Sequence, residues 1–127
     1  TYARGAIGQT PERLGFRDAG GDVQVMFVNS VSGPKQYRFQ VDGWDQYEDE
    51  GVVLARKAEN TQFFQIIEID GDELHYEART ALGELYDDFV MRKDDAGRKT
   101  IVRGATSTMD ERSYETTGPY EGAGDLK

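Results

Sequence analysis

The most informative stretch for the fold is Gln62 to Arg92, QFFQIIEIDGDELHYEARTALGELYDDFVMR. Its pattern predicts three strands joined by two tight turns. Positions 63–69 are rich in aromatic and β-branched residues, which suit a pleated and half-buried sheet surface. Asp70-Gly71 is a strong hairpin signal. A second turn is predicted at Thr80–Gly83, where glycine again ends the run.

The second and third strands of this stretch differ in their patterning. Leu74, Tyr76 and Ala78 alternate with polar residues, so the second strand has one apolar and one solvated face. The third strand, 85–92, carries apolar residues on both parities, with Tyr86 and Val90 opposite the others, and needs cover on both faces. The pattern predicts a β-rich α+β fold with a mostly antiparallel sheet and a three-strand meander over 62–92.

Composition limits the kinds of partner. The chain of 127 residues is long enough for one domain with a modest core. Acidic residues number 24 against 15 basic ones, net −9, which argues against nucleic acid or an anionic membrane. The absence of cysteine excludes disulfides, thiolate metal sites and cysteine nucleophiles. No apolar run approaches the roughly 20 residues of a transmembrane segment, and nothing resembles a signal peptide.

The remaining segments are assigned from local composition. We expect a Gly- and Pro-rich loop at 6–22, an interior strand of a covered sheet at 23–31, one or two helical turns at 52–59, and a short edge strand at 99–103. The Gly-, Ser- and Thr-rich tail, 104–127, should be disordered unless the domain's own surface or a neighbouring chain holds it.

Few residues qualify as catalytic. His75 lies on the solvated face of its strand and is interpreted as a solvated cross-strand partner. Asp70 and Asp72 belong to a turn, whereas Asp87 and Asp88 point to opposite faces of a strand and cannot act jointly.

Two further groups are candidate binding sites. The acidic run 45–50 lacks the ligand spacing of a calcium loop. Asn29, Ser30 and Ser32 lie at the end of a predicted strand and can line a pocket, but no base is placed to activate either serine. The residues themselves therefore predict no catalytic group and no metal ligand.

Four motifs carry a family resemblance. TYARG (1–5), NSVSGPKQY (29–37), AENTQFFQIIEIDGD (58–72) and ALGELYDDF (81–89) keep the order and spacing of the C-terminal part of bacterial calcineurin-like metallophosphoesterases, on the purple-acid-phosphatase side. The chain resembles that family over 1–93; Leu82 departs from it, where a small polar residue is expected. In the family, TYARG follows a Gly-His-x-His metal motif, which here would precede Thr1.

The resemblance implies an α/β/β/α catalytic domain to which this chain supplies the closing strands. Such enzymes hydrolyse phosphate esters with two divalent metals that activate a bridging water and polarise the phosphoryl oxygens. Their ligands lie upstream, so none falls on a residue here. Tyr2 and Arg4 would orient the metal histidines or reach substrate phosphate, or else form a strand buried beside the site. Asn29, Ser30 and Ser32 would end a strand near the rim of the site.

Two interpretations follow. In the first, the chain is a processed product, an excised domain or a fragment of a phosphoesterase: 1–93 completes the catalytic domain, and 94–127 forms an edge hairpin and tail. It is inactive alone and pairs through an apolar sheet face with the upstream half or with itself. Relatives are often exported, which would place the parent in the periplasm or outside the cell. In the alternative, the chain is a free-standing β-rich module that contacts carbohydrate or protein through Trp44, Tyr37 and Tyr47.

Overall fold

The computed structural model describes residues 2–8, 22–30, 32–33, 38–39, 45, 49 and 52–117. Within these ranges the chain forms strands and one short helix. They are β1 (Tyr2–Gly8), β2 (Asp22–Ser30), β3 (Val53–Ala58), β4 (Phe63–Asp70), β5 (Glu73–Thr80), β6 (Leu85–Lys93), β7 (Lys99–Arg103) and α2 (Tyr114–Thr117).

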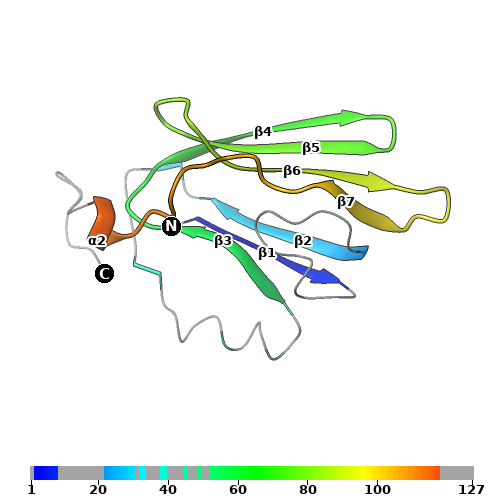
Figure 1. The fold of residues 1–127 in the computed structure, drawn as a ribbon, viewed down its shortest axis with the longest axis horizontal. Coiled ribbons are helices and arrows are strands. Elements are labelled where there is room, and N and C mark those ends of the chain that lie inside the picture. The colour runs from blue at the N-terminus through cyan, green and yellow to red at the C-terminus, as the bar shows by residue number, and fades with distance from the viewer. Residues whose placement is uncertain are drawn as a thin grey trace.

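The strands follow one hydrogen-bonded order, β3-β1-β2-β7-β6-β5-β4, and every neighbouring pair is antiparallel. The junction between β2 and β7 is short, with only the pairs Asp22↔Thr100 and Val23↔Lys99. The sheet divides there into two layers, β3-β1-β2 and β7-β6-β5-β4 (Figure 1). The predicted β-rich, mostly antiparallel fold is confirmed.

The predicted meander is also confirmed as β4, β5 and β6. Asp70 pairs with Glu73 beside the first turn, and Phe63 pairs with Thr80 at the far end of the same hairpin. Gly71 and Gly83 adopt φ angles of 58° and 88°. Those left-handed conformations disfavour a side chain, so glycine at these two positions explains why the turns form where the sequence places them.

The simple alternation predicted for the third strand is wrong at Tyr86. The register between β5 and β6 shifts, so that Ala78 pairs with Asp87 but Arg79 pairs with Leu85. Tyr86 is the extra residue of this β-bulge, and it joins Phe89 in the core instead of pointing away from it. Burial on both faces of β6, which the sequence required, is confirmed by the buried run 86–90.

The core lies between the two layers and is rich in aromatic rings. Tyr2 of β1 lies 5.1 Å from Phe63 of β4, and Phe63 lies 4.9 Å from Tyr86 of β6, measured between ring centroids. Tyr76 stacks on Phe89 at 4.9 Å. Because these rings come from both layers, their burial holds the layers together.

Three local expectations in the first half of the chain need correction. Residues 53–58 form strand β3 rather than helical turns, because they pair with β1 over five residue pairs. Ala6–Gly8 and Asp22 belong to β1 and β2 rather than to a loop, and 9–21 lies outside the described residues. β2 is a strand as predicted, but Phe27 and Val28 are exposed, so the sheet is not covered there.

The C-terminal segments also differ from expectation. β7 pairs with both β6 and β2 instead of forming an edge. The tail is ordered and packed on the domain's own surface up to α2, with Ala105, Ser107 and Tyr114 buried. The prediction of disorder rests on composition alone, and composition contains no information about long-range contacts. Residues 118–127 lie outside the described residues. No helix in the described ranges has the length and apolarity needed to cross a bilayer.

Candidate functional site

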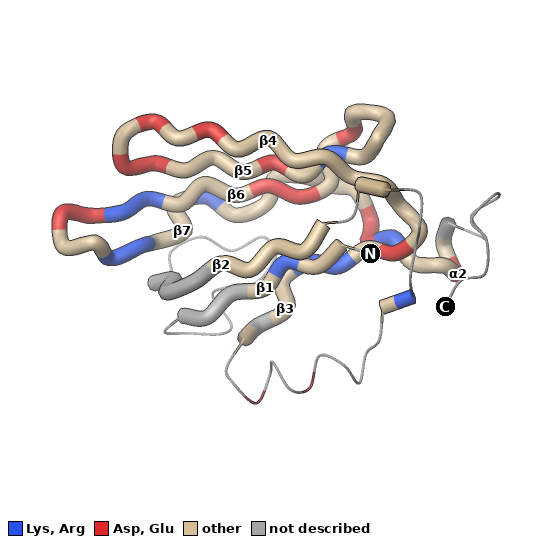
Figure 2. The backbone as a smooth tube through the Cα atoms, turned by 180° about the vertical axis from the view of Figure 1, so that it is seen from behind, with Lys and Arg blue, Asp and Glu red and all other residues tan. Residues whose placement is uncertain are grey.

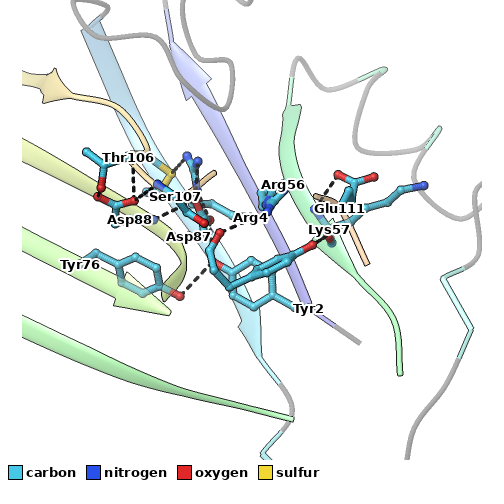
Figure 3. A network of polar contacts seen from close by, with 12 residues as sticks. Tyr2, Arg4, Arg56, Lys57, Tyr76, Asp87, Asp88, Thr106, Ser107 and Glu111 are labelled. Atoms are coloured by element: carbon cyan, nitrogen blue, oxygen red, sulfur yellow. Dashed lines mark hydrogen bonds and ion pairs between the residues drawn. The ribbon is translucent and has the colours of Figure 1, made fainter. Parts of the chain in front are cut away.

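A polar cluster lies buried between the two layers, and we call Tyr2, Arg4, Tyr76 and Asp87 the inter-layer cluster (Figure 3). Arg4 donates to Asp87 from Nε to Oδ2 at 2.6 Å and from Nη2 to Oδ1 at 3.1 Å. The Tyr2 hydroxyl donates to Asp87 Oδ2 at 2.8 Å and lies 3.1 Å from the Tyr76 hydroxyl. The carboxylate therefore joins β1 to β6 through three side-chain hydrogen bonds.

The local structure explains why these side chains meet. Tyr2 and Arg4 are two residues apart on β1 and so share one face. Asp87 pairs with Ala78, two residues from Tyr76 on β5, which puts both polar groups on the inward face of the meander. The neighbouring bulge at Tyr86 leaves Asp87 facing β1.

The electrostatics favour a fixed, ionic arrangement. Arg4 and Asp87 are 1% and 0% exposed, so each charge has lost its water and depends on its partner. Burial, followed by the charge of Asp87, raises the pKa of Tyr2 well above its ordinary range. Burial also raises the pKa of Tyr76 to about 12. Both phenols remain neutral donors at physiological pH, so the cluster is suited to holding geometry rather than to transferring protons.

Asp88 forms a separate cluster on the other side of β6. It accepts hydrogen bonds from Arg103 Nη1 at 2.6 Å, from the Thr106 amide and hydroxyl at 2.7 Å each, and from the Ser107 amide at 3.3 Å. Burial opposes ionisation of Asp88, but the bonds from Thr106, Arg103 and Ser107 outweigh it and lower the pKa of this carboxyl. Asp87 and Asp88 thus point to opposite faces, as predicted, and Asp88 binds the segment that covers β6.

A third set of contacts fixes the segment before α2. The Tyr86 hydroxyl donates to the Lys57 carbonyl at 2.6 Å and accepts from the Arg112 amide at 3.0 Å. Arg56 lies 3.9 Å over the Tyr86 ring and donates to the Met109 carbonyl at 2.6 Å. Burial raises the pKa of Tyr86 to about 12. β3, β6 and the segment 109–112 are joined here.

The sequence-predicted residues gather at one end of β1 and β2. Tyr2 pairs with Ser30 and Ala3 with Asn29 in the register of the two strands. Ser30 is half-buried and accepts a hydrogen bond from Gln65 of β4, whereas Asn29 is exposed. Ser32 is exposed, and its carbonyl accepts from Gln62 Nε2 at 3.3 Å. Tyr2, Arg4 and Ser30 share the inner face, while Asn29 faces outward.

An open apolar groove lies beside this cluster between β2 and the meander. Its volume is about 560 Å³, and its walls include Met26, Val28, Ile67, Leu74 and Met91. Tyr76 and Phe89 also line it, so the groove borders the inter-layer cluster.

The other candidates remain apart from these clusters. His75 is 43% exposed and lies 3.4 Å from Glu73, which confirms a solvated side chain. Across the described ranges no three His, Asp or Glu side chains gather as metal ligands would.

Figure 2 shows acidic residues along the β4–β5 hairpin and basic residues in β1, β3 and β7. In the acidic run only Asp45 and Asp49 are described, and both are exposed. Tyr37, Trp44 and Tyr47 lie outside the described residues.

Comparison with protein-family models, with curated proteins and with solved structures found no match.

Sequence reasoning missed Asp87 and Tyr76 as partners of Tyr2 and Arg4. The signal was the pair Asp87-Asp88 inside a strand that is otherwise apolar on both parities. A carboxylate at such a position is buried at high cost unless a cation or several donors meet it. That argument predicts partners without identifying them, since Arg4 lies 83 residues away.

Proposed function

We propose that this chain is the C-terminal part of a metal-dependent phosphoesterase whose catalytic residues lie upstream, and that its own role is structural. The four motifs in 1–93 support this proposal by their order and spacing. In this interpretation the two layers described above close the catalytic domain of the parent protein, which hydrolyses phosphate mono- or diesters.

The main observation behind the proposal is that buried side-chain contacts fix the position of β1. In the resembling family, Tyr2 and Arg4 directly follow the metal-binding histidines. Here both side chains are buried and bound to Asp87. A strand held this firmly would fix the path of the residues that precede it. The commitment of both side chains to Asp87 favours a positioning role for Tyr2 and Arg4 over direct contact with phosphate.

The metal ions of such an enzyme do not fit the described residues, which offer no cluster of three His, Asp or Glu side chains. In the resembling family, Asp, Asn and His residues upstream of this segment hold the two divalent metals. This chain contributes the support beneath them.

The partner implied by this function is the upstream half of the same catalytic domain. Phe27 is 44% exposed on the outer face of β2, opposite Gly5 of β1. Asn29 is exposed on that same face. An upstream segment that packs there would cover the apolar ring and bring Asn29 near the rim of the site.

The test compares this chain with the product of the complete gene, using an aryl phosphate and added divalent metals. We expect a Gly-His-x-His sequence directly before Thr1, metal-dependent turnover by the complete product, and none by this chain. In the complete product, Asp87→Asn should lower turnover, while His75→Gln, on the solvated face, serves as the matched control. Turnover by the isolated chain, or a complete product without the histidine motif and without turnover, would overturn the proposal.

A further inference from the structure

The two edge strands of the sheet, β3 and β4, differ in whether another segment pairs with their outer side. At the β3 edge, Ala58 forms a bridge with Arg112, and the Glu59 amide donates to the Arg112 carbonyl at 2.9 Å. β3 also carries Arg56 and Lys57, and charged residues on an edge oppose strand addition. At the β4 edge, no segment in the described part of the chain pairs with the outer side of the strand. Within the described ranges, one edge is protected by the chain itself and the other is left unpaired.

β4 has the composition of a strand that receives a partner. Its sequence, FFQIIEID, contains no lysine, arginine or proline, which commonly block edge pairing, and its charged residues are Glu68 and Asp70. Phe64 and Ile66 on its outer face are 42% and 40% exposed, and Ile67 and Ile69 on its inner face are 59% and 74% exposed. Five of the eight residues in β4 are apolar, and an exposed edge of this kind is a template for another strand.

We propose that β4 pairs antiparallel with β4 of a second copy of this chain, about a twofold axis at Ile66. In that register Ile66 lies opposite its own copy, Phe63 opposite Ile69, and Gln65 opposite Ile67. Apolar residues therefore meet apolar residues at the centre and at both ends. A register centred on Ile67 is inferior, because it places Ile66 opposite Glu68 and Phe64 opposite Asp70.

The charge pattern favours a second copy in this orientation. The antiparallel register sets Glu68 opposite Phe64, so neither copy places a carboxylate against a carboxylate. Parallel pairing in register would place Glu68 against Glu68, which is destabilising. The pairing joins the two meanders into one continuous sheet and gathers four exposed apolar side chains from each copy at the seam, Phe64, Ile66, Ile67 and Ile69.

Two properties of the dimer follow. A single strand pair is a small interface, so we expect association in the micromolar range rather than an obligate dimer. Each copy carries a net charge of −9, so the copies repel one another at long range, and added salt should strengthen the dimer. A basic partner protein would show the opposite salt dependence. The inference is independent of the proposed phosphoesterase function, because it concerns only the edge of this chain.

The first test measures mass against concentration by light scattering and sedimentation. We expect a monomer–dimer equilibrium that Ile66→Lys weakens at least tenfold. Val102→Lys is the matched control, because Val102 of β7 is 37% exposed and lies away from the seam. A monomer at every concentration, or a dimer that survives Ile66→Lys, would overturn the proposal.

The second test does not depend on the lysine variant folding. The chain has no cysteine, so a single introduced thiol reports on its own copy. In the proposed register Ile66→Cys forms a disulfide-linked dimer on mild oxidation, and Ile67→Cys, which faces Gln65, forms it more slowly. Equal rates, or faster linkage at 67, would refute the register centred on Ile66.

Discussion

Arg4 and Asp87, which are 83 residues apart in the chain, form a bidentate ion pair that joins the two layers of the sheet. Both side chains are almost completely inaccessible to solvent. Tyr2 shares the same carboxylate, with its hydroxyl 2.8 Å from Oδ2. Because a buried charge without a partner is costly, the pairing makes the position of β1 depend on β6.

Removing one member of this pair should destabilise the fold more than removing both. Arg4→Met leaves the Asp87 charge buried with only neutral donors, and we expect a loss of about 3–5 kcal/mol in the free energy of unfolding. The double variant Arg4→Met/Asp87→Leu removes both charges and should lose less than Arg4→Met alone. Tyr2 keeps the Tyr76 hydroxyl as a neighbour in the double variant. Urea denaturation of both variants and of the unmodified protein measures these losses, and a loss under about 1 kcal/mol for Arg4→Met would contradict this account.

Asp88 should make stability sensitive to acid. Its folded pKa lies below the ordinary value of about 3.9, so the ionised carboxylate stabilises the fold above roughly pH 4. That contribution is lost as the pH falls through the lowered pKa. Asp88→Asn should cost about 1–3 kcal/mol at neutral pH and flatten the acid limb of the stability profile.

The matched control for Asp88 is Asp70→Asn, at an exposed position beside a turn. Asp70→Asn leaves the hydrogen bonds from Thr106 and Ser107 to Asp88 in place, so the stability of this variant should keep its Asp88-dependent fall in acid. If Asp88→Asn and Asp70→Asn give the same profile, the hydrogen bonds to Thr106 and Ser107 do not contribute as described.

The buried phenols should make the protein unstable in alkali. Burial raises the folded pKa of Tyr76 and Tyr86 to about 12, against about 10 in the unfolded chain. Their contribution to stability is complete below pH 10 and is lost as the pH rises toward 12. Tyr76→Phe should remove one late-titrating phenol, seen as the difference in tyrosinate absorbance between the two proteins. If the difference between the two titration curves lies near the ordinary pKa of tyrosine, Tyr76 is not buried as described.

The Tyr86 hydroxyl should hold the segment before α2 on the sheet. Tyr86→Phe leaves the Lys57 carbonyl and the Arg112 amide without this partner, and should cost about 1–3 kcal/mol. Hydrogen exchange should accelerate at the Arg112 amide. Tyr114→Phe is the control, since the buried Tyr114 hydroxyl has no hydrogen-bond partner among the described residues, and its removal should be neutral or stabilising. Equal losses for the two variants would contradict the role given to Tyr86.

Sequence-based predictions succeeded where neighbouring residues contain the information. The hairpin at Gly71 and the alternation in β5 arise within a few residues, and the structure has both. They failed at β3 and at 104–117, whose conformations depend on pairing with β1 and on bonds to Asp88. Of the candidate site residues, Tyr2 and Ser30 meet in register, but their proximity required strand pairing that local patterns do not reveal.

By itself, the sequence determined the antiparallel meander and its turns, because a period of two and a glycine with positive φ are local properties of the chain. Its lack of cysteine also excluded disulfides and thiolate sites in this chain. Tertiary contacts alone establish that Arg4 meets Asp87 and that Tyr86 turns inward at a bulge. They also establish that β4 is an edge strand among the residues that the structure describes. Those outcomes depend on contacts between residues far apart in sequence, where burial rather than local propensity sets the free energy.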